Sequence, residues 1–449
     1  MIRRAIVVGL GHTGLSCVPY LRGTGYDVVV CDSRADPPLA AALAALDATV
    51  PLYTGPFSPR LLAEADLLVI SPGVSLKDPA IRSAAANNVP IVGDIELFAR
   101  VCAAPIIAIT GANGKSTVTS LVGEMLRACG RTVEVAGNIG VPVLSLLGRP
   151  APDLYVLELS SFQLETTSSL NAQAATVLNI SPDHMDRYTD LDEYVHAKVR
   201  VFAGSGRMVI NRDDARVATM ARSGRDVVTF GLDRPIGHDL GVVDNGGETW
   251  LMQGKQPLMP AADVPLPGLH NVANVLAAFA LATAVSRDTS AMAAAVRQFR
   301  GLAHRTTVVG VAHGVTWIDD SKGTNVGATM AAMAGLPGPI VLIAGGEGKA
   351  ADFRALRAVV GAKARAVIVI GRDGPQIAVA LAGCCPVVVA ADLPSAVAQA
   401  RMLAQEGDSV LLSPACASFD MFRDYAHRGE VFADAVQKLV LMPPEREHG

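Results

Sequence analysis

Short apolar runs alternate with longer stretches rich in Ala and Leu along almost the whole chain. Each run is β-rich, and most of them end at Gly, Ser, Asp or Pro. The runs are AIVVGL, DVVVCD, LLVISP, IIAITG, YVLELS and TVLNIS before residue 300, and VTWIDD, IVLIAGG, AVIVIG, PVVVAA and VLLSPA after it. Apolar strands that alternate with helices are typical of parallel sheets covered by helices. The pattern therefore predicts an α/β fold.

The length of the chain predicts more than one domain. At 449 residues it is longer than a usual single domain, which has ~100–200 residues. Two helical segments that lead into new strands mark candidate boundaries, GDIELFARVCAAP (93–105) and RQFRGLAHR (297–305). We therefore expect three domains, residues 1–93, 94–299 and 300–449.

Composition and charge argue against several classes of protein. A formal net charge of −4 gives no support for nucleic-acid binding, which usually requires a basic face. No apolar run approaches the ~18–20 residues of a membrane span. The apolar part of the N-terminal MIRRAIVVGL is too short for a signal peptide and indicates a first strand. Seven cysteines without a C-x-x-C pair indicate a reduced, cytoplasmic protein with neither a disulfide framework nor a zinc site.

One glycine-rich segment has the form of a phosphate-binding loop. The strand APIIAIT leads into GANGKST, and the helix VTSLVGEMLRACG follows. Gly111 and Gly114 would let backbone N–H groups and the helix N-terminus face an anion. Lys115 would reach the β- and γ-phosphates, and the Ser116 hydroxyl would serve Mg²⁺. The loop is the short form G-x-x-G-K-S, so a plain glycine-rich turn is the alternative.

A second glycine-rich turn, GLGHTG (9–14), is a weaker signal. It follows the first strand and fits G-x-G-x-x-G, and Asp32 ends the next strand. The arrangement is compatible with NAD, with another nucleotide, or with glycines that serve only strand–helix packing.

Lysine is scarce in this chain, and its positions are informative. Only eight of the 38 Lys and Arg residues are Lys. Four of these eight lie in motif-like contexts, NGKST, YVHAKVR, DDSKGTN and GGEGKAADF. Arg cannot replace Lys where a compact amine or a modifiable nitrogen is needed, so these four lysines are candidates for chemistry. Chance placement is the alternative.

Two further candidates follow strands of the middle domain. Glu158 ends a strand after the phosphate loop, where α/β enzymes place ligands and metal-binding acids. His184 lies beyond another strand end, between Asp183 and Asp186. A structural histidine in a solvated loop is the alternative for that segment.

These motifs, taken in order, resemble those of the Mur ligases. The ordered matches are GANGKST, ELSSFQLE, NISPDHMDRY, YVHAKVRVF, LPGLHNVANVLAA, FRGLAHR, DDSKGTN, GGEGKAADF and SPACASFDMFRDYAHRGEVF. The resemblance covers essentially the whole chain. It implies a Rossmann-like N-terminal domain for a uridine nucleotide, a central P-loop-type ATPase α/β domain, and a Rossmann-like C-terminal domain for an amino acid.

Within the family, GLGHTGLSCV, CDSR, SPGVS and GDIELF resemble the members that add D-glutamate. The implied reaction joins D-glutamate to UDP-N-acetylmuramoyl-L-alanine through an acyl-phosphate and a tetrahedral intermediate, and yields ADP and phosphate. The implied protein is a cytoplasmic peptidoglycan-precursor enzyme. We expect a monomer that neither binds nucleic acid nor inserts into a membrane.

The resemblance also implies site residues, position by position. The residues implied for ATP are Gly111, Ala112, Asn113, Gly114, Lys115, Ser116, Thr117, Asn271, Asn274, Arg305, Asp320 and Lys322. Those implied for the uridine diphosphate substrate are Thr13, Asp32, Ser33, Arg34 and Asn138, and those for D-glutamate are Thr324, Lys349, Ser418 and Tyr425. The implied catalytic residues are Lys115, His184 and Lys198, and the ligands implied for two Mg²⁺ ions are Ser116, Glu158, His184 and Lys198.

Lys198 fits a metal site only if it is modified, because an ammonium group cannot bind Mg²⁺. It matches the family position that is carbamylated, and CO₂ addition would give the oxygen ligand that Mg²⁺ prefers. An ordinary surface lysine on the helix LDEYVHAKVRVF is the alternative.

Several positions depart from the family pattern. They include Ala112, Asp319, Glu347 and Tyr425. None of these changes removes a residue with a required chemical role. Two rival functions remain, a sister amide ligase with another acceptor, and a non-catalytic or NAD-linked module.

Overall fold

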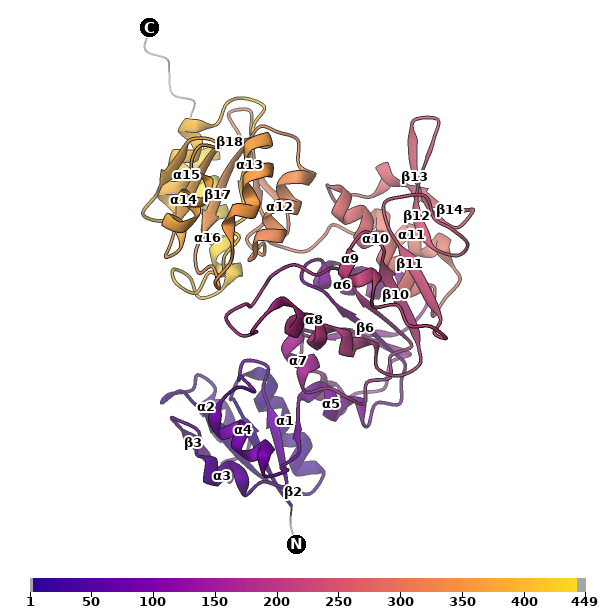
Figure 1. The fold of residues 1–449 in the computed structure, drawn as a ribbon, viewed down its shortest axis with the longest axis vertical. Helices are drawn as coiled ribbons and strands as arrows, with labels where there is room; N and C mark the ends of the chain where they lie inside the picture. Colours follow the sequence, from indigo (N-terminus) through magenta and orange to yellow (C-terminus); the bar gives the residue numbers. More distant parts are fainter. Residues whose placement is uncertain (1–2, 442–449) are drawn as a thin grey trace.

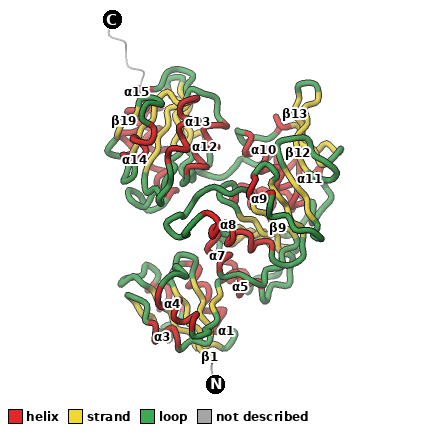
Figure 2. Tube along the Cα trace, viewed as in Figure 1, coloured by secondary structure: helices red, strands yellow, loops and turns green. Residues whose placement is uncertain are grey.

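The apolar runs form buried strands of three separate sheets, as the hydrophobic pattern predicts. The computed structural model describes residues 3–441 and contains three α/β domains. The first lies at one end of the long axis, and the third lies beside the part of the middle domain that is farther from the first (Figure 1). Figure 2 shows the strands as the inner layer of the domains, with helices outside them. None of the helices between residues 3 and 441 has the length and apolarity to cross a membrane.

The first domain has a five-stranded parallel sheet in the order β3-β2-β1-β4-β5. Its strands are β1 (Arg3–Val8), β2 (Tyr26–Asp32), β3 (Leu52–Thr54), β4 (Leu67–Ile70) and β5 (Ile91–Val92). Its helices are α1 (His12–Gly23), α2 (Ala40–Leu46), α3 (Pro59–Ala63) and α4 (Pro79–Ala86). The strand order reverses at β1, so the turn 9–14 that follows β1 opens onto the crevice where such sheets bind ligands.

The middle domain has a nine-stranded sheet in the order β14-β13-β12-β11-β10-β9-β6-β8-β7. Its strands are β6 (Ile106–Thr110), β7 (Val133–Gly137), β8 (Leu154–Glu158), β9 (Ala174–Val177), β10 (Arg207–Asn211), β11 (Val227–Phe230), β12 (Leu240–Asn245), β13 (Glu248–Gln253) and β14 (Gln256–Pro260). Its helices are α5 (Asp94–Ala99), α6 (Lys115–Ala128), η1 (Val143–Leu146), α7 (Ser161–Glu165), α8 (Leu191–Val199), η2 (Arg200–Phe202), α9 (Ala215–Ala218), η3 (Ala261–Asp263), α10 (Leu269–Ala282) and α11 (Thr289–Gln298). Helix α6, which begins at the phosphate loop, packs against α10 and α11.

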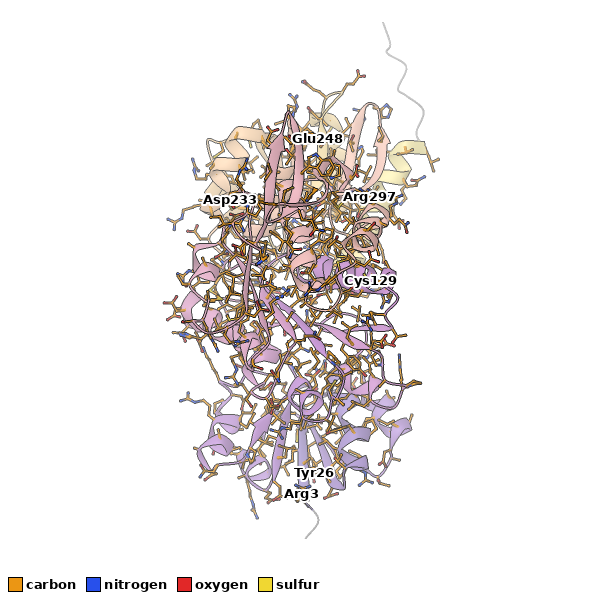
Figure 3. The ribbon with its side chains drawn as sticks, turned by 90° about the vertical axis from the view of Figure 1, so that its right-hand side faces the viewer. Arg3, Tyr26, Cys129, Asp233, Glu248 and Arg297 are labelled. Atoms are coloured by element: carbon orange, nitrogen blue, oxygen red, sulfur yellow. The ribbon has the colours of Figure 1, made fainter. Side chains whose placement is uncertain are left out.

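Strands β12, β13 and β14 pair antiparallel, which the apolar runs did not predict. β12 and β13 carry exposed polar residues toward their shared turn at Gly246 and Gly247, both of which have positive φ. Such half-exposed strands lack the continuous apolar pattern of a buried parallel strand. Figure 3 shows Glu248 near the end of this hairpin, far from Arg3 and Tyr26 at the opposite end of the molecule.

The third domain has a six-stranded sheet in the order β15-β16-β20-β17-β18-β19, with β15 antiparallel to β16. Its strands are β15 (Thr307–Ala312), β16 (Val315–Asp319), β17 (Ile340–Gly345), β18 (Ala364–Ile370), β19 (Val387–Val389) and β20 (Ser409–Leu412). Its helices are α12 (Val326–Gly335), η4 (Phe353–Leu356), α13 (Arg357–Lys363), α14 (Gly374–Leu381), α15 (Leu393–Leu403) and α16 (Tyr425–Leu441).

Strand β17 shows why such runs are apolar at every position. Val341 and Ile343 belong to one hydrophobic core, whereas Ile340 and Leu342 belong to another. Successive side chains point to opposite faces of a strand, so a sheet covered on both faces needs an apolar residue at each position.

Helix α5 connects the first sheet to the second, and the side chain of Glu96 holds this helix in place. The side chain is 2% exposed, and Glu96 Oε2 accepts hydrogen bonds from the backbone N–H groups of Ser168 and Ser169 at 2.7 and 2.9 Å. Arg100 Nε donates to Glu96 Oε1 at 2.9 Å. Burial by itself raises the pKa of Glu96, but these hydrogen bonds lower it to about 2. The ionised carboxylate therefore holds α5 on the loop after α7.

Replacing Glu96 by Gln should lower the free energy of unfolding by roughly 1–3 kcal/mol at pH 7, because hydrogen bonds to a charged acceptor are lost. The folded-state pKa of about 2 lies below the ordinary value of 4.5. The stabilisation is therefore complete above pH 4.5 and is lost as the pH falls toward 2. Urea unfolding at pH 7 and pH 4 should show a smaller deficit at the lower pH.

The matched control is Glu64→Gln, whose carboxylate is 49% exposed in a surface pair with Arg4. This change should alter the unfolding free energy by less than about 1 kcal/mol at both pH values. Equal deficits for the two variants would contradict a fastening role for Glu96.

Candidate active site

A cavity of about 240 Å³ lies where loops of the middle and third domains meet. Two sets of sequence-predicted residues face each other across it. Those from the middle domain are Ala112, Asn113, Gly114, Lys115, Ser116, Asn138, Glu158 and His184, and those from residue 305 onward are Arg305, Lys322, Thr324, Lys349, Ser418 and Tyr425. The cavity therefore collects positions that are more than three hundred residues apart in the sequence.

The phosphate loop joins β6 to α6, as the sequence predicts. Gly114 caps α6 with a φ of 83°, and a Cβ atom there would lie 2.5 Å from Asn274 Oδ1. Glycine is therefore required both for the conformation and for the close approach. The Lys115 ammonium donates hydrogen bonds to the carbonyls of Gly111 and Ala112, both at 2.9 Å, and burial lowers its pKa. Lys115 thus folds back onto the loop, whose Ala112 and Asn113 N–H groups donate to the backbone carbonyl and the side chain of Asn179.

Glu158 leaves one carboxylate oxygen unused. Its Oε1 atom accepts a hydrogen bond from Asn138 Nδ2 at 2.7 Å, whereas the buried Oε2 atom has no hydrogen-bond partner. A buried carboxylate oxygen without a partner is unfavourable unless a cation or a donor occupies the space beside it. The Ser116 hydroxyl, which accepts from Arg305 Nη2 at 2.8 Å, lines the same cavity.

Within residues 3–441, no group of three or more His, Cys, Asp and Glu side chains is arranged to hold a metal ion. A cation beside Glu158 would therefore need oxygen ligands from a hydroxyl or from bound phosphates. That combination is usual for Mg²⁺, which retains few protein ligands.

Lys198 does not line the cavity but lies behind the phosphate loop. It is 1% exposed, and its Nζ atom donates to the Gly111 carbonyl at 2.9 Å and lies 4.6 Å from the centre of the Tyr194 ring. Burial and the nearby Lys115 lower the pKa of Lys198 well below its ordinary value. The surface-lysine alternative is therefore wrong, and the amine is held where its neutral, nucleophilic form is favoured.

His184 adopts a left-handed backbone conformation with a φ of 58°. Burial lowers its pKa to about 4, so the imidazole is neutral at pH 7 and has a lone pair available for a ligand. Its neighbour Asp183 accepts a hydrogen bond from Lys349 Nζ at 3.0 Å and another from Asn325 Nδ2 at 3.1 Å. Burial raises the pKa of Asp183, but Lys349 and His184 lower it to about 2.

A second cavity, of about 80 Å³, adjoins the first. Its wall includes the predicted Thr117, Asn271, Asn274 and Asp320, and it shares Asn113, Gly114, Arg305 and Lys322 with the first cavity.

Charged groups in this second wall are strongly buried. Burial raises the pKa of Asp320 to about 7, and its Oδ2 atom accepts from the Ser413 hydroxyl at 2.7 Å. Burial and the adjacent Arg305 lower the pKa of Lys322 to about 8, and its ammonium lies 3.6 Å from the centre of the Tyr425 ring.

A third cavity, of about 610 Å³, contains the predicted residues of the first domain, Thr13, Asp32, Ser33 and Arg34. Asp32 Oδ2 accepts from the Leu10 N–H group at 2.7 Å, and Arg34 pairs with both carboxylate oxygens at 2.8 and 2.7 Å. The hydrogen bond from Arg34 is the main reason that the pKa of Asp32 falls to about 2. Asn138 lines this cavity as well as the first one, so the two are adjacent.

Comparisons with known proteins agree with this arrangement. The model of the Mur ligase MurD-like N-terminal domain matches residues 3–93, that of the Mur ligase middle domain matches residues 109–282, and that of the Mur ligase glutamate ligase domain matches residues 304–416. Two relatives are named UDP-N-acetylmuramoylalanine–D-glutamate ligase. The protein from Thiobacillus denitrificans is 53% identical over 97% of this chain and 96% of its own, and that from Nitrosococcus oceani is 51% identical over 97% of both.

The chain belongs to the Mur ligase family. It is therefore an enzyme and a ligase, and the NAD-linked and non-catalytic alternatives are excluded.

Solved structures of Mur ligases share the fold. The UDP-N-acetylmuramate-alanine ligase of Thermotoga maritima is 20% identical, has a TM-score of 0.59, and covers 97% of this chain and 99% of its own. The MurF ligase of the same organism, solved in complex with ADP, is 14% identical, has a TM-score of 0.60, and covers 98% of each chain.

Sequence reasoning missed two residues of this Mur ligase that join its middle and third domains. Asp183 pairs with Lys349, and Asn325 hydrogen-bonds both Asp183 and Asn113. The motifs NISPDHMDRY and DDSKGTN contained both residues, but nothing in either motif shows that the other one lies beside it.

Replacing Asp183 by Asn should loosen the contact between these domains. The variant loses the carboxylate that accepts hydrogen bonds from Lys349 and Asn325. Loss of hydrogen bonds to a charged group should weaken the contact by roughly 1–3 kcal/mol. Small-angle X-ray scattering of the ligand-free protein should then show a larger radius of gyration. The exposed Asp186, two residues beyond His184, provides the control Asp186→Asn. An unchanged radius in the Asp183 variant would show that this pair does not hold the domains together.

Proposed function

We propose that this Mur ligase adds D-glutamate to UDP-N-acetylmuramoyl-L-alanine at the expense of ATP, forming ADP and phosphate. The observation that carries the proposal is the continuity of the cavities. A nucleotide crevice in the first domain adjoins the phosphate loop through Asn138, and Lys349, Thr324 and Ser418 of the third domain face the same space. The relatives that are 51–53% identical bear the name of this activity.

Residue roles follow from this placement. Thr13, Asp32, Ser33 and Arg34 would hold the uridine diphosphate end of the substrate, and Asn138 would hold its carboxyl end near the phosphate loop. The second cavity would take the adenosine of ATP between Asn271, Asn274 and Asp320. Thr324 and Lys349 would receive the α-carboxylate of D-glutamate, and Ser418 and the backbone near Tyr425 would receive its side-chain carboxylate.

The first chemical step brings two anions together. A substrate carboxylate oxygen attacks the γ-phosphorus of ATP, the bond to the bridging oxygen breaks, and ADP leaves. Positive charge must offset the repulsion, so electrostatic stabilisation and positioning carry most of the catalysis. Lys115 supplies one cation from the middle domain, and Arg305 and Lys322 supply two more from the far wall.

The residues present fit Mg²⁺. The unpartnered Glu158 Oε2 and the Ser116 hydroxyl would hold one ion, and neutral His184 together with a modified Lys198 would contribute to a second. The chemistry that Mg²⁺ supplies when bound is charge neutralisation at the phosphates.

In the second step the amine of D-glutamate attacks the acyl-phosphate carbon. The attacking nitrogen loses one proton to solvent, the tetrahedral intermediate collapses, the carbon–oxygen bond to phosphate breaks, and the amide and inorganic phosphate remain. Lys349 and Thr324 would aim the amine at this carbon by fixing the α-carboxylate beside it, because orientation of the two reactants accounts for much of the rate.

Lys198 would act as a carbamate. Its neutral amine adds to CO₂, a nitrogen–carbon bond forms, and one proton is released to solvent. Burial and the nearby Lys115 favour the neutral amine that this addition requires.

We further propose that the protein works in the cytoplasm as a monomer. The proposed domain limits are residues 1–93, 94–299 and 300–449.

Phosphate release from ATP, measured with UDP-N-acetylmuramoyl-L-alanine and four acceptors, tests the reaction. We expect D-glutamate to stimulate release, whereas L-glutamate, L-alanine and meso-diaminopimelate do not, because two fixed carboxylate sites reject the wrong configuration or length. Release with another acceptor would favour a sister amide ligase. If none of the four acceptors stimulates phosphate release in the presence of bicarbonate and Mg²⁺, the proposal is overturned.

Replacing Lys198 by Ala should reduce turnover by at least about a hundredfold, since a metal ligand and its charge are lost. Excess bicarbonate should not restore the variant, whereas it should restore wild-type protein stripped of CO₂. ¹³C-bicarbonate should give a carbamate NMR signal in the wild type that is absent from the variant. Lys255→Ala, at an exposed lysine of the middle domain, should keep both turnover and signal. The same carbamate signal in the Lys198 variant would contradict modification at this position.

A further inference from the structure

A loop of the first domain lies directly against the segment that carries His184. Arg187 Nη1 donates a hydrogen bond to the Gly73 carbonyl at 3.1 Å, and Arg187 Nη2 donates to the Val74 carbonyl at 3.2 Å. Gly73 and Val74 also line the nucleotide cavity of the first domain. Arg187 therefore reaches from the middle domain to the wall of that cavity.

The same arginine is connected to His184 by two routes. Its guanidinium carbon lies 4.4 Å from the centre of the Phe162 ring, and the Phe162 ring meets the His184 ring edge-on at 4.8 Å between centres. Its backbone N–H group donates to the His184 carbonyl at 2.9 Å and closes a turn that begins at His184. That turn includes the left-handed φ of 58° at His184, which a non-glycine residue adopts only when its surroundings hold it there.

The partners of Arg187 in the first domain are neutral carbonyls. Within residues 3–441, Arg187 takes part in no ion pair with a carboxylate. Its two hydrogen bonds need both carbonyls to point the same way, because the guanidinium donors form a rigid fork. The position of Arg187 therefore depends on the conformation of the loop at Gly73 and Val74.

We propose that Arg187 is a positioning residue that couples occupancy of the nucleotide cavity to the placement of His184. This inference rests on the proposed function, in which the cavity receives the uridine diphosphate end of the substrate. A bound nucleotide fixes the loop at Gly73 and Val74, the loop fixes Arg187, and Arg187 fixes Phe162 and the turn at His184. The catalytic histidine is then set before phosphoryl transfer begins.

Lys77 provides a matched control from the same loop. Its ammonium also crosses to the middle domain, where it donates to Glu193 Oε2 at 2.8 Å and to the Thr189 hydroxyl at 3.1 Å. Lys77 and Glu193 are 49% and 39% exposed, so their pair contributes little. Neither of these hydrogen bonds of Lys77 is made to Phe162 or to His184.

Steady-state kinetics on the full chain give the first test. Arg187→Ala should lower kcat about tenfold to a hundredfold, the range for a catalytic group displaced by about 1 Å, with KM for D-glutamate unchanged. Arg187→Lys should recover part of the lost kcat. Phe162→Leu should also lower kcat. The double variant Arg187→Ala with Phe162→Leu should lose less than the product of the two effects, because both act on one chain of contacts. Lys77→Met should stay within about twofold of the wild type. An Arg187→Ala variant that behaves like Lys77→Met would overturn the proposal.

Histidine NMR gives a second test that needs no turnover. UDP alone, at saturation established by calorimetry, should shift the ring signal of His184 in protein labelled at histidine, with His184→Gln used for assignment. In Arg187→Ala, UDP should still bind, but the shift of the His184 signal should vanish. Persistence of that shift would overturn the proposal. If the wild type does not ligate D-glutamate but UDP moves the His184 signal, the proposed reaction fails and the coupling stands.

Discussion

The structure depends above all on a concentration of buried positive charge around one loop. Lys115, Arg305 and Lys322 line a single cavity, and Lys198 lies behind its wall. Their partners are carbonyls, a hydroxyl and an aromatic face: Lys115 and Lys198 donate to loop carbonyls, Arg305 donates to the Ser116 hydroxyl, and Lys322 lies over the Tyr425 ring. The carboxylates of Glu158, Asp183 and Asp320 offset part of the cost of burying these cations. In the proposed function, the phosphates of ATP would supply further negative charge.

A lysine that lines the same cavity also links the third domain to the middle domain. Lys349 extends from the third domain to Asp183, and Asn325 links Asp183 to Asn113 of the phosphate loop. The proposed acceptor and phosphate sites therefore share one hydrogen-bonded group. In the proposed function, an incoming α-carboxylate would compete with Asp183 for Lys349. Acceptor binding and the domain contact would then involve the same ammonium group.

Local patterns in the sequence were sufficient for the strands and for the phosphate loop. Buried parallel strands are continuous apolar runs, and the loop is a contiguous motif whose glycines have a steric reason to be there. The scarcity of lysine was also informative. Lys115, Lys198, Lys322 and Lys349 all gather at or behind the central cavity, while Lys77, Lys255 and Lys438 are exposed. Four of the eight lysines therefore lie at or behind the cavity, and these are the four in motif-like contexts, whereas the other four do not.

Contacts between distant segments could not be predicted in this way. Arg187 and Gly73 are 114 residues apart, and Lys349 and Asp183 are 166 apart. Each pair depends on how two domains meet, and a single sequence contains no pattern that records it. The antiparallel hairpin β12–β13 was not predicted for a different reason. Its strands are half-exposed, so their sequences resemble those of polar loops.

Backbone strain lies at the same junctions. His184 and Lys349 both adopt left-handed φ angles, 58° and 52°, on loops that meet across the cavity. An isolated loop would relax such a conformation, because each non-glycine residue in this region is disfavoured by of the order of 1 kcal/mol or more. The Asp183–Lys349 pair restrains both loops. The hydrogen bonds of Arg187 to the first domain further restrain the loop of His184. The conformation of these two loops is therefore a property of the assembled domains.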